Sequence, residues 1–84
     1  MSKFKYNLAV IGLGYVGLPL AIEAANSKLK VAGYDINESL VDSLNKSTSH
    51  VEDISDKVLQ DAISKDLLFT SDSSVLGDSE YIVI

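Results

Sequence analysis

The sequence predicts an α/β fold: a doubly wound parallel sheet with strand order 3-2-1-4 and helices on both faces. Two observations predict its parallel strands, and the glycine pattern described below predicts the strand order. Short apolar, β-branched runs alternate along the chain with segments of helical periodicity, and no tight hairpin dipeptide of the Asn-Gly kind joins two runs. Parallel strands need long crossover connections, so this alternation favours a parallel sheet over an antiparallel meander. The 84 residues suffice for one small domain at most.

The first predicted unit is a strand, a turn and a helix. Residues 6–11 (YNLAVI) are an apolar run bounded by glycine, which suits a strand buried on both faces. Residues 12–17 are expected to form a tight turn. Residues 18–25 are rich in helix formers and predict a buried helix, in whose first turn Pro19 is tolerated.

A second strand is expected over residues 30–34, and Asn37 is expected to cap the helix that follows. Ile36 and Val41 are spaced as a hydrophobic staple around this cap. The inner face of the helix is predicted to hold Leu40, Val41 and Leu44.

Ser55 is expected to cap a third helix after a polar, turn-like stretch. Its inner face is predicted to be formed by the apolar residues at helical spacing, Val58, Leu59, Ala62 and Ile63. Residues 67–70 read as a third strand, residues 71–76 as a helical turn closed by Gly77, and residues 81–84 as a fourth strand. Because the chain stops inside this apolar run, we expect residues 1–84 to be part of a larger domain.

Three glycines carry the sharpest functional signal. Gly12, Gly14 and Gly17 form a G-x-G-x-x-G pattern between the first strand and the first helix. Gly12 allows a sharp turn out of the strand, Gly14 leaves the backbone open to a diphosphate, and Gly17 lets the helix pack tightly on the sheet. A diphosphate would lie on the free amides of the helix start, so no basic side chain is needed. The pattern predicts a Rossmann-type dinucleotide site.

Asp35 strengthens this prediction, because it ends the second strand eighteen residues after Gly17. At that place an acid accepts hydrogen bonds from the adenosine ribose and repels a 2′-phosphate, so NAD is predicted in preference to NADP. The alternative is that Asp35 only caps the following helix.

Tyr15 and Val16 are expected to face the cofactor through their backbone amides, although Tyr15 equally fits a surface or packing aromatic. His50 reads as a solvated loop residue. The acidic cluster of Glu52, Asp53 and Asp56 fits a solvated face and a negatively charged helix start better than a cation site. No metal site and no catalytic residue are predicted.

The composition limits the classes of molecule that the chain is expected to bind. The net charge is -5, and eleven of the twelve acids follow Tyr34. Without Arg, binding to nucleic acid or to an anionic membrane is disfavoured. The absence of Cys excludes disulfides and thiolate sites, and a cytoplasmic location fits. Lys3 and Lys5 before the uncharged run to Ile22 also resemble a secretory signal, but glycines and Pro19 interrupt that run.

The segments IGLGYVGLPLA (residues 11–21), GYDIN (33–37), VDSLN (41–45) and LFTSD (68–72) resemble the start of the UDP-glucose/GDP-mannose dehydrogenase family. GYVGLPLA and HVEDIS (50–55) are more similar to members acting on UDP-N-acetylhexosamines, such as UDP-N-acetylmannosamine or UDP-N-acetylglucosamine dehydrogenases, than to UDP-glucose enzymes.

This resemblance implies the NAD-binding segment of an enzyme that oxidises the C6 alcohol of a UDP-sugar to a carboxylate, through a thiohemiacetal on a Cys, for polysaccharide synthesis. It also implies a parent protein that is a homodimer or higher oligomer. The catalytic Cys, Lys and Asn have no matching positions here, so the 84 residues alone are expected to be inactive.

Two alternatives stay open. One is a non-catalytic NAD-sensing regulatory domain, as in potassium channels and transporters; the helical insert over residues 47–65 speaks against it. The other is a different NAD-dependent Rossmann dehydrogenase, which fold analogy alone does not separate.

Overall fold

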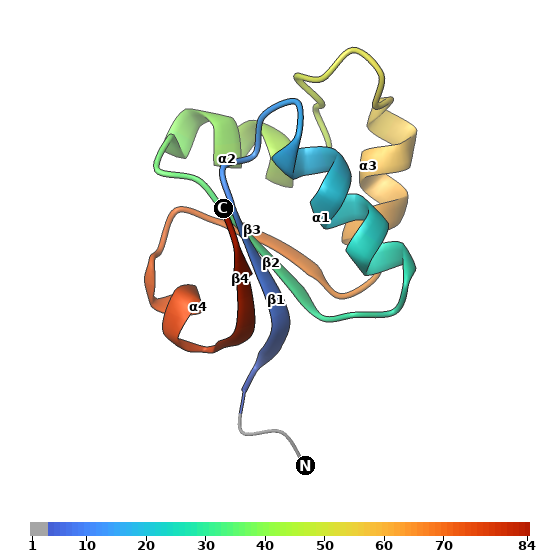
Figure 1. Cartoon of the computed structure of the whole chain (residues 1–84). Helices are drawn as coiled ribbons and strands as arrows, with labels where there is room; N and C mark the ends of the chain where they lie inside the picture. The colour runs from blue at the N-terminus through green and yellow to red at the C-terminus, as the bar shows by residue number, and fades with distance from the viewer. Residues whose placement is uncertain (1–3) are drawn as a thin grey trace.

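The structure, a computed structural model, describes residues 4–84 and contains a four-stranded parallel sheet flanked by helices (Figure 1). Along the chain the elements are β1 (Tyr6–Ile11), α1 (Gly17–Asn26), β2 (Val31–Tyr34), α2 (Glu38–Asn45), α3 (Asp56–Ile63), β3 (Leu67–Thr70), α4 (Ser74–Gly77) and β4 (Ser79–Val83). The strand order is β3-β2-β1-β4, which confirms the predicted doubly wound sheet.

The order of the strands explains why helices lie on both faces. The chain moves from β1 to β2 to β3 in one direction, then returns past β2 to place β4 beside β1. Since parallel crossovers are right-handed, reversing direction moves the connection to the opposite face. Accordingly α1, α2 and α3 lie on one side of the sheet, and α4 lies on the other (Figure 1).

The core is divided unequally between the two faces. The larger cluster fills the space between the sheet and α1, α2 and α3, and its largest fully buried side chains are Phe69, Leu13, Leu18, Leu44 and Leu59. The smaller cluster lies under α4 and consists of Ala9, Ala32 and Val75. The thin second cluster leaves that face of the sheet lightly covered.

Both predicted helix caps are confirmed. The side chain of Asn37 accepts a hydrogen bond from the backbone N–H of Leu40 at 3.1 Å, and Ser55 accepts one from Val58 at 3.1 Å. Each cap satisfies one N–H group that has no partner within the helix.

Two predicted apolar contacts are wrong. Ile36 is 83% exposed, so it does not form the staple with the buried Val41. Val58 is 44% exposed, because the inner face of α3 is centred on Leu59 and Ala62 and leaves Val58 at its margin. In addition, β4 begins at Ser79, earlier than the predicted Tyr81, and α1 already begins at Gly17.

Within residues 4–84, no helix has both the length and the hydropathy needed to cross a bilayer.

Candidate functional site

The predicted site lies at the carboxyl ends of β1 and β2, where the glycine turn joins β1 to α1 (Figure 1). Gly12 extends the pairing of these strands, because its N–H donates to the carbonyl of Tyr34 at 2.9 Å. Its φ of 91° lies in a region that side chains with a Cβ rarely adopt. Gly12 therefore ends β1 with a sharp change of direction that other residues would make only under strain.

Gly17 is required for close packing at the start of α1. A Cβ at Gly17 would collide with the carbonyl group of Gly12, and it would also contact the Val10 side chain. The prediction placed this close approach against the sheet, whereas the structure places it mainly against the turn itself.

Gly14 has open space in front of it. A Cβ built on Gly14 meets no atom within 4 Å, and the residue is exposed. Its carbonyl accepts the N–H of Leu18 at 3.1 Å, which starts the helical hydrogen bonds of α1. The first N–H groups of a helix have no acceptor inside it. The turn therefore offers bare backbone donors next to unfilled space, which fits a bound diphosphate.

Tyr15 and Val16 form the exposed tip of this turn, with 76% and 82% of their surfaces accessible. Together with the three glycines, Leu20 and the end of β4 at Val83 and Ile84, they line a hollow of about 370 Å³. This volume lies within the range of about 300 to 1,000 Å³ that is usual for small-molecule sites.

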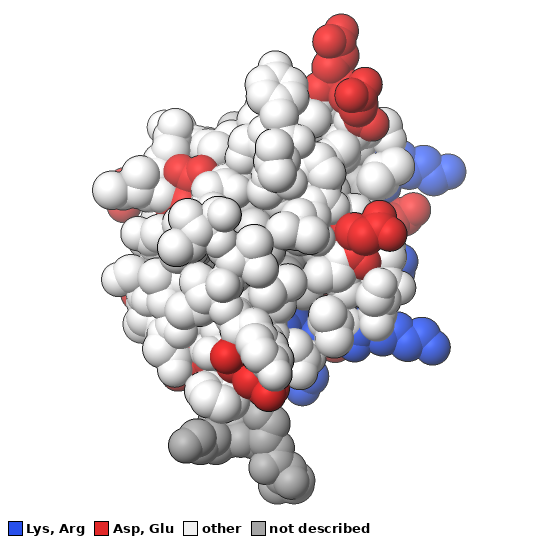
Figure 2. Space-filling view, in the orientation of Figure 1, with Lys and Arg blue, Asp and Glu red and all other residues white. Residues whose placement is uncertain are grey.

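The surface around this hollow carries little charge. Figure 2 shows a broad uncharged area over β4 in the centre of the view, with Asp and Glu side chains toward its margins and Lys side chains on one side. No side chain that lines the hollow is charged, so the donors that it offers to an anion are chiefly backbone N–H groups.

Asp35 lies directly beside the glycine turn. Its Oδ2 atom accepts a hydrogen bond from the backbone N–H of Leu13 at 3.0 Å, and its Oδ1 atom accepts one from the N–H of Asn37 at 2.9 Å. The residue is half-buried. The alternative reading of Asp35 as the cap of α2 is wrong, because Asn37 is that cap.

Leu13 was not singled out by the sequence analysis. Its side chain is fully buried in the larger core cluster, although it lies in the middle of an otherwise exposed turn. A Cβ on Gly33 of β2 would come within 3.0 Å of this side chain, so Leu13 packs tightly over the strand. The available signal was an apolar residue between two glycines, where a solvated turn would have a polar one.

The other candidates lie away from this site. His50 is exposed in the loop before α3. Asp56 begins α3 and accepts a hydrogen bond from the backbone N–H of Ser49 at 2.8 Å, which ties down the loop. Across the described part of the chain, no group of three or more His, Cys, Asp or Glu residues is placed to hold a metal.

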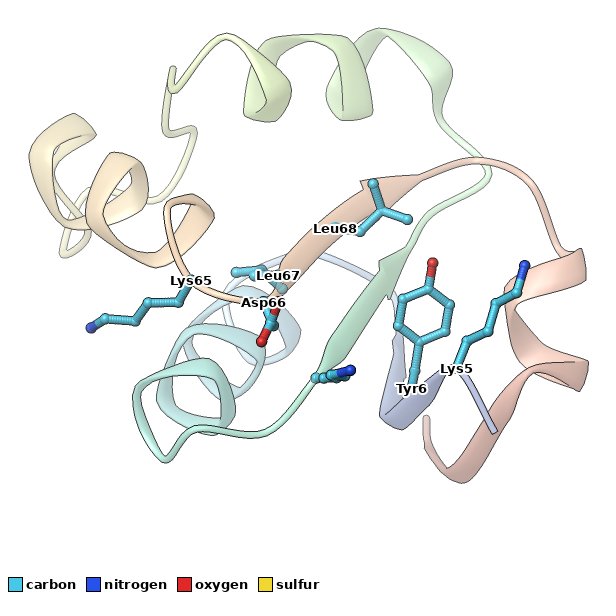
Figure 3. A pocket seen from close by; sticks show the side chains of 7 residues that line it. Lys5, Tyr6, Lys65, Asp66, Leu67 and Leu68 are labelled. Atoms are coloured by element: carbon cyan, nitrogen blue, oxygen red, sulfur yellow. The ribbon is translucent and has the colours of Figure 1, made fainter. Parts of the chain in front are cut away.

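A second hollow, of about 270 Å³, lies near the amino-terminal ends of the strands. It is lined by Lys5, Tyr6, Lys30, Lys65, Asp66, Leu67 and Leu68. Figure 3 shows the side chains of Lys5 and Lys65 pointing away from each other. The ammonium group of Lys65 donates to the side chain of Asn26 at 2.7 Å. These lysines therefore do not converge on one anion, and this hollow is a weaker candidate.

Comparison with known proteins bears on the glycine turn. Residues 6–84 match the model of the UDP-glucose/GDP-mannose dehydrogenase family, NAD binding domain. The chain is 37% identical over 78 residues to protein CapL of Staphylococcus aureus, covering 93% of this chain and 18% of that protein. It is also 37% identical over 78 residues to UDP-N-acetyl-D-mannosamine dehydrogenase of Escherichia coli K12, covering 92% and 19%.

Among solved structures, UDP-N-acetyl-mannosamine dehydrogenase from Pyrococcus horikoshii superposes with a TM-score of 0.81 at 36% identity, over 93% of this chain and 19% of that one. The chain thus spans about a fifth of the length of these relatives.

Proposed function

Because the chain belongs to the UDP-glucose/GDP-mannose dehydrogenase family, as part of its NAD-binding domain, we propose that the glycine turn and Asp35 together hold the NAD. The backbone N–H groups of Tyr15, Val16 and Gly17 lie at the start of α1 and would receive the diphosphate. Gly12 and Gly14 keep the approach to these amides free of side chains. When bound, NAD accepts the hydride released on oxidation of an alcohol.

One observation carries this assignment: the 3.0 Å hydrogen bond between the N–H of Leu13 and Asp35 Oδ2. It puts a carboxylate beside the turn that would receive the diphosphate. A ribose attached to that diphosphate is then within reach of the Asp35 carboxylate, whose oxygens can accept hydrogen bonds from the ribose hydroxyl groups. A 2′-phosphate at the same place would meet a negative charge, which favours NAD over NADP.

We propose further that these residues form part of the cofactor domain of a larger cytoplasmic, homo-oligomeric enzyme that oxidises the C6 alcohol of a UDP-sugar to a carboxylate. UDP-N-acetylmannosamine is the substrate best supported, since the E. coli and P. horikoshii relatives are named for it. The name of the CapL protein supports a role in capsule polysaccharide synthesis. The 84 residues contain no Cys, so a thiol step cannot be carried by this segment.

The test is calorimetric titration of the wild type and of Asp35→Ala with NAD and with NADP. A charge-assisted hydrogen bond contributes about 1.5 to 3 kcal/mol, so NAD should bind the wild type roughly tenfold or more tightly than NADP. Asp35→Ala should lose this preference. The exposed acid Asp61 of α3 supplies the control, because Asp61→Ala removes the same charge far along the chain from the turn. Equal affinities for both cofactors in the wild type would remove the role assigned to Asp35.

A further inference from the structure

The carboxylate of Asp35 connects the end of β2 with the glycine turn, 22 residues earlier, and with the start of α2, two residues later. Asp35 itself follows β2, its Oδ2 atom holds the N–H of Leu13 in the glycine turn, and its Oδ1 atom holds the N–H of Asn37, which caps α2. Both oxygens are therefore fixed by backbone donors without any ligand. Each oxygen of a carboxylate has two lone pairs, so each still has one acceptor position for a ribose hydroxyl.

The glycine turn needs such support. Glycine loses more conformational freedom on ordering than any other residue, and this turn contains three of them within six residues. Among the contacts that fix the turn, Gly12 donates to Tyr34, the Gly14 carbonyl accepts from Leu18, the Leu13 side chain is buried, and the Leu13 N–H donates to Asp35. The bond to Asp35 is the charge-assisted one among these, and such bonds are the stronger kind.

We propose that Asp35 serves the cofactor site twice: it accepts hydrogen bonds from the ribose, and it holds the glycine turn in its binding shape before any cofactor arrives. This inference rests on the proposed function and deepens it, because it makes Asp35 a positioning residue for the diphosphate, which its side chain does not touch. Loss of the Asp35 carboxylate then weakens the binding even of a ligand that has no ribose.

Charge repulsion and the positioning role predict opposite signs for the effect of one substitution on pyrophosphate binding. Asp35→Asn removes a negative charge near the diphosphate, so Coulomb interaction alone would tighten the binding of inorganic pyrophosphate. An Asn side chain has one acceptor oxygen and a donor NH₂ group, so it cannot accept from both Leu13 and Asn37 with separate atoms. The turn would loosen, and pyrophosphate would bind more weakly.

The first experiment measures amide hydrogen exchange by NMR in the ligand-free protein. In Asp35→Asn the N–H of Leu13 should exchange roughly tenfold faster or more than in the wild type. Asp72→Asn is the matched control: Asp72 accepts a hydrogen bond from the N–H of Ser74, two residues on, as Asp35 does from Asn37, but Ser74 belongs to α4 and not to the glycine turn. Unchanged exchange at Leu13 would overturn the inference.

The second experiment titrates the same proteins with inorganic pyrophosphate and with NAD, following the resonances of residues 12–17. The inference predicts several-fold weaker pyrophosphate binding in Asp35→Asn; equal or tighter binding would overturn it. If neither ligand moves these resonances in the wild type, the proposed function fails instead, and the exchange result for Leu13 shows separately whether Asp35 orders the turn.

If Asp35→Asn does not fold, a measurement on the wild-type protein alone tests the inference. A scalar coupling across the hydrogen bond, between the Leu13 amide nitrogen and the Asp35 carboxylate carbon, is expected in the ligand-free protein. Its absence while the Asn37 coupling is present would show that the turn is not held by Asp35, and the inference would be wrong.

Discussion

At the scale of single residues, the three glycines of the turn meet three different physical requirements. Gly12 supplies a positive φ, Gly17 leaves room for the Gly12 carbonyl group, and Gly14 leaves space that no atom of residues 4–84 fills. Only the first two are needed for the fold itself. The third becomes necessary when a ligand approaches the backbone.

This difference gives a prediction for two single-methyl substitutions. Gly17→Ala should destabilise the protein by about 1 to 3 kcal/mol, because the new Cβ forces α1 away from the turn. Gly14→Ala should leave the free energy of unfolding nearly unchanged and should weaken NAD binding, since its Cβ occupies the approach to the amides. Urea unfolding and NAD titration of both variants check this pair. Equal loss of stability in the two variants would contradict the assignment.

The residues of the turn and Asp35 could be predicted because each has a backbone or charge requirement that few residue types meet. The bond between Leu13 and Asp35 could not be predicted, because it depends on how the ends of β1 and β2 lie relative to each other. The exposure of Ile36 was missed for a local reason: the N–H of Asn37 donates to the Asp35 carboxylate two residues before it, and Ile36 between them is left in solvent.

At the scale of elements, the sequence was sufficient to predict where a helix begins when a single capping side chain determines that position. Asn37 and Ser55 start α2 and α3 as their capping chemistry predicts. The inner face of α3 was harder, because periodicity gives a stripe of residues but not its centre. Val58 belongs to the stripe by spacing, yet packing against α1 and β3 buries Leu59 and Ala62 instead.

The start of α4 yields a prediction about pH. The backbone N–H of Ser74 donates to Asp72 Oδ1 at 3.0 Å, and this bond, with a contribution from the Ser74 hydroxyl, lowers the pKa of Asp72 below its usual 3.8. Because the folded pKa is depressed, the bond stabilises the protein above pH 3.8 and this contribution is lost as the pH falls through the folded value.

An NMR titration of the Asp72 carboxyl carbon checks this. The midpoint in the wild type should lie below 3.8. Ser74→Pro, which removes the backbone N–H that donates to Asp72, should raise the midpoint toward 3.8. Ser74→Ala keeps the N–H and should raise it less. A midpoint that Ser74→Pro leaves unchanged would show that the N–H is not the cause.

At the scale of the whole molecule, the strand order could be predicted because the glycine pattern between β1 and α1 is typical of a doubly wound sheet in this order. The sequence alone could not predict how completely helices and side chains cover the sheet. β4 is an edge strand of the described sheet, and Tyr81, Ile82 and Val83 are 66%, 46% and 36% exposed. A lightly charged apolar edge of this kind is a template for pairing with another strand.

We therefore expect the 84-residue chain to self-associate through β4 at high concentration. Sedimentation equilibrium should show dimers or larger species that Ile82→Lys reduces, because a charged side chain on the edge opposes pairing. Leu68→Lys is the control, since Leu68 is similarly exposed, at 43%, but lies on β3 at the opposite edge. A strictly monomeric wild type at high concentration would contradict this expectation.

The most direct test of the central claim, that NAD is held at the carboxyl ends of β1 and β2, is a chemical-shift map of the wild-type protein during titration with NAD. We predict that the largest shifts fall on the amides of residues 12–17 and on Asp35. Shifts centred instead on Lys5, Lys30 and Lys65, near the amino-terminal ends of the strands, would contradict it. Unchanged shifts in the glycine turn would contradict it as well.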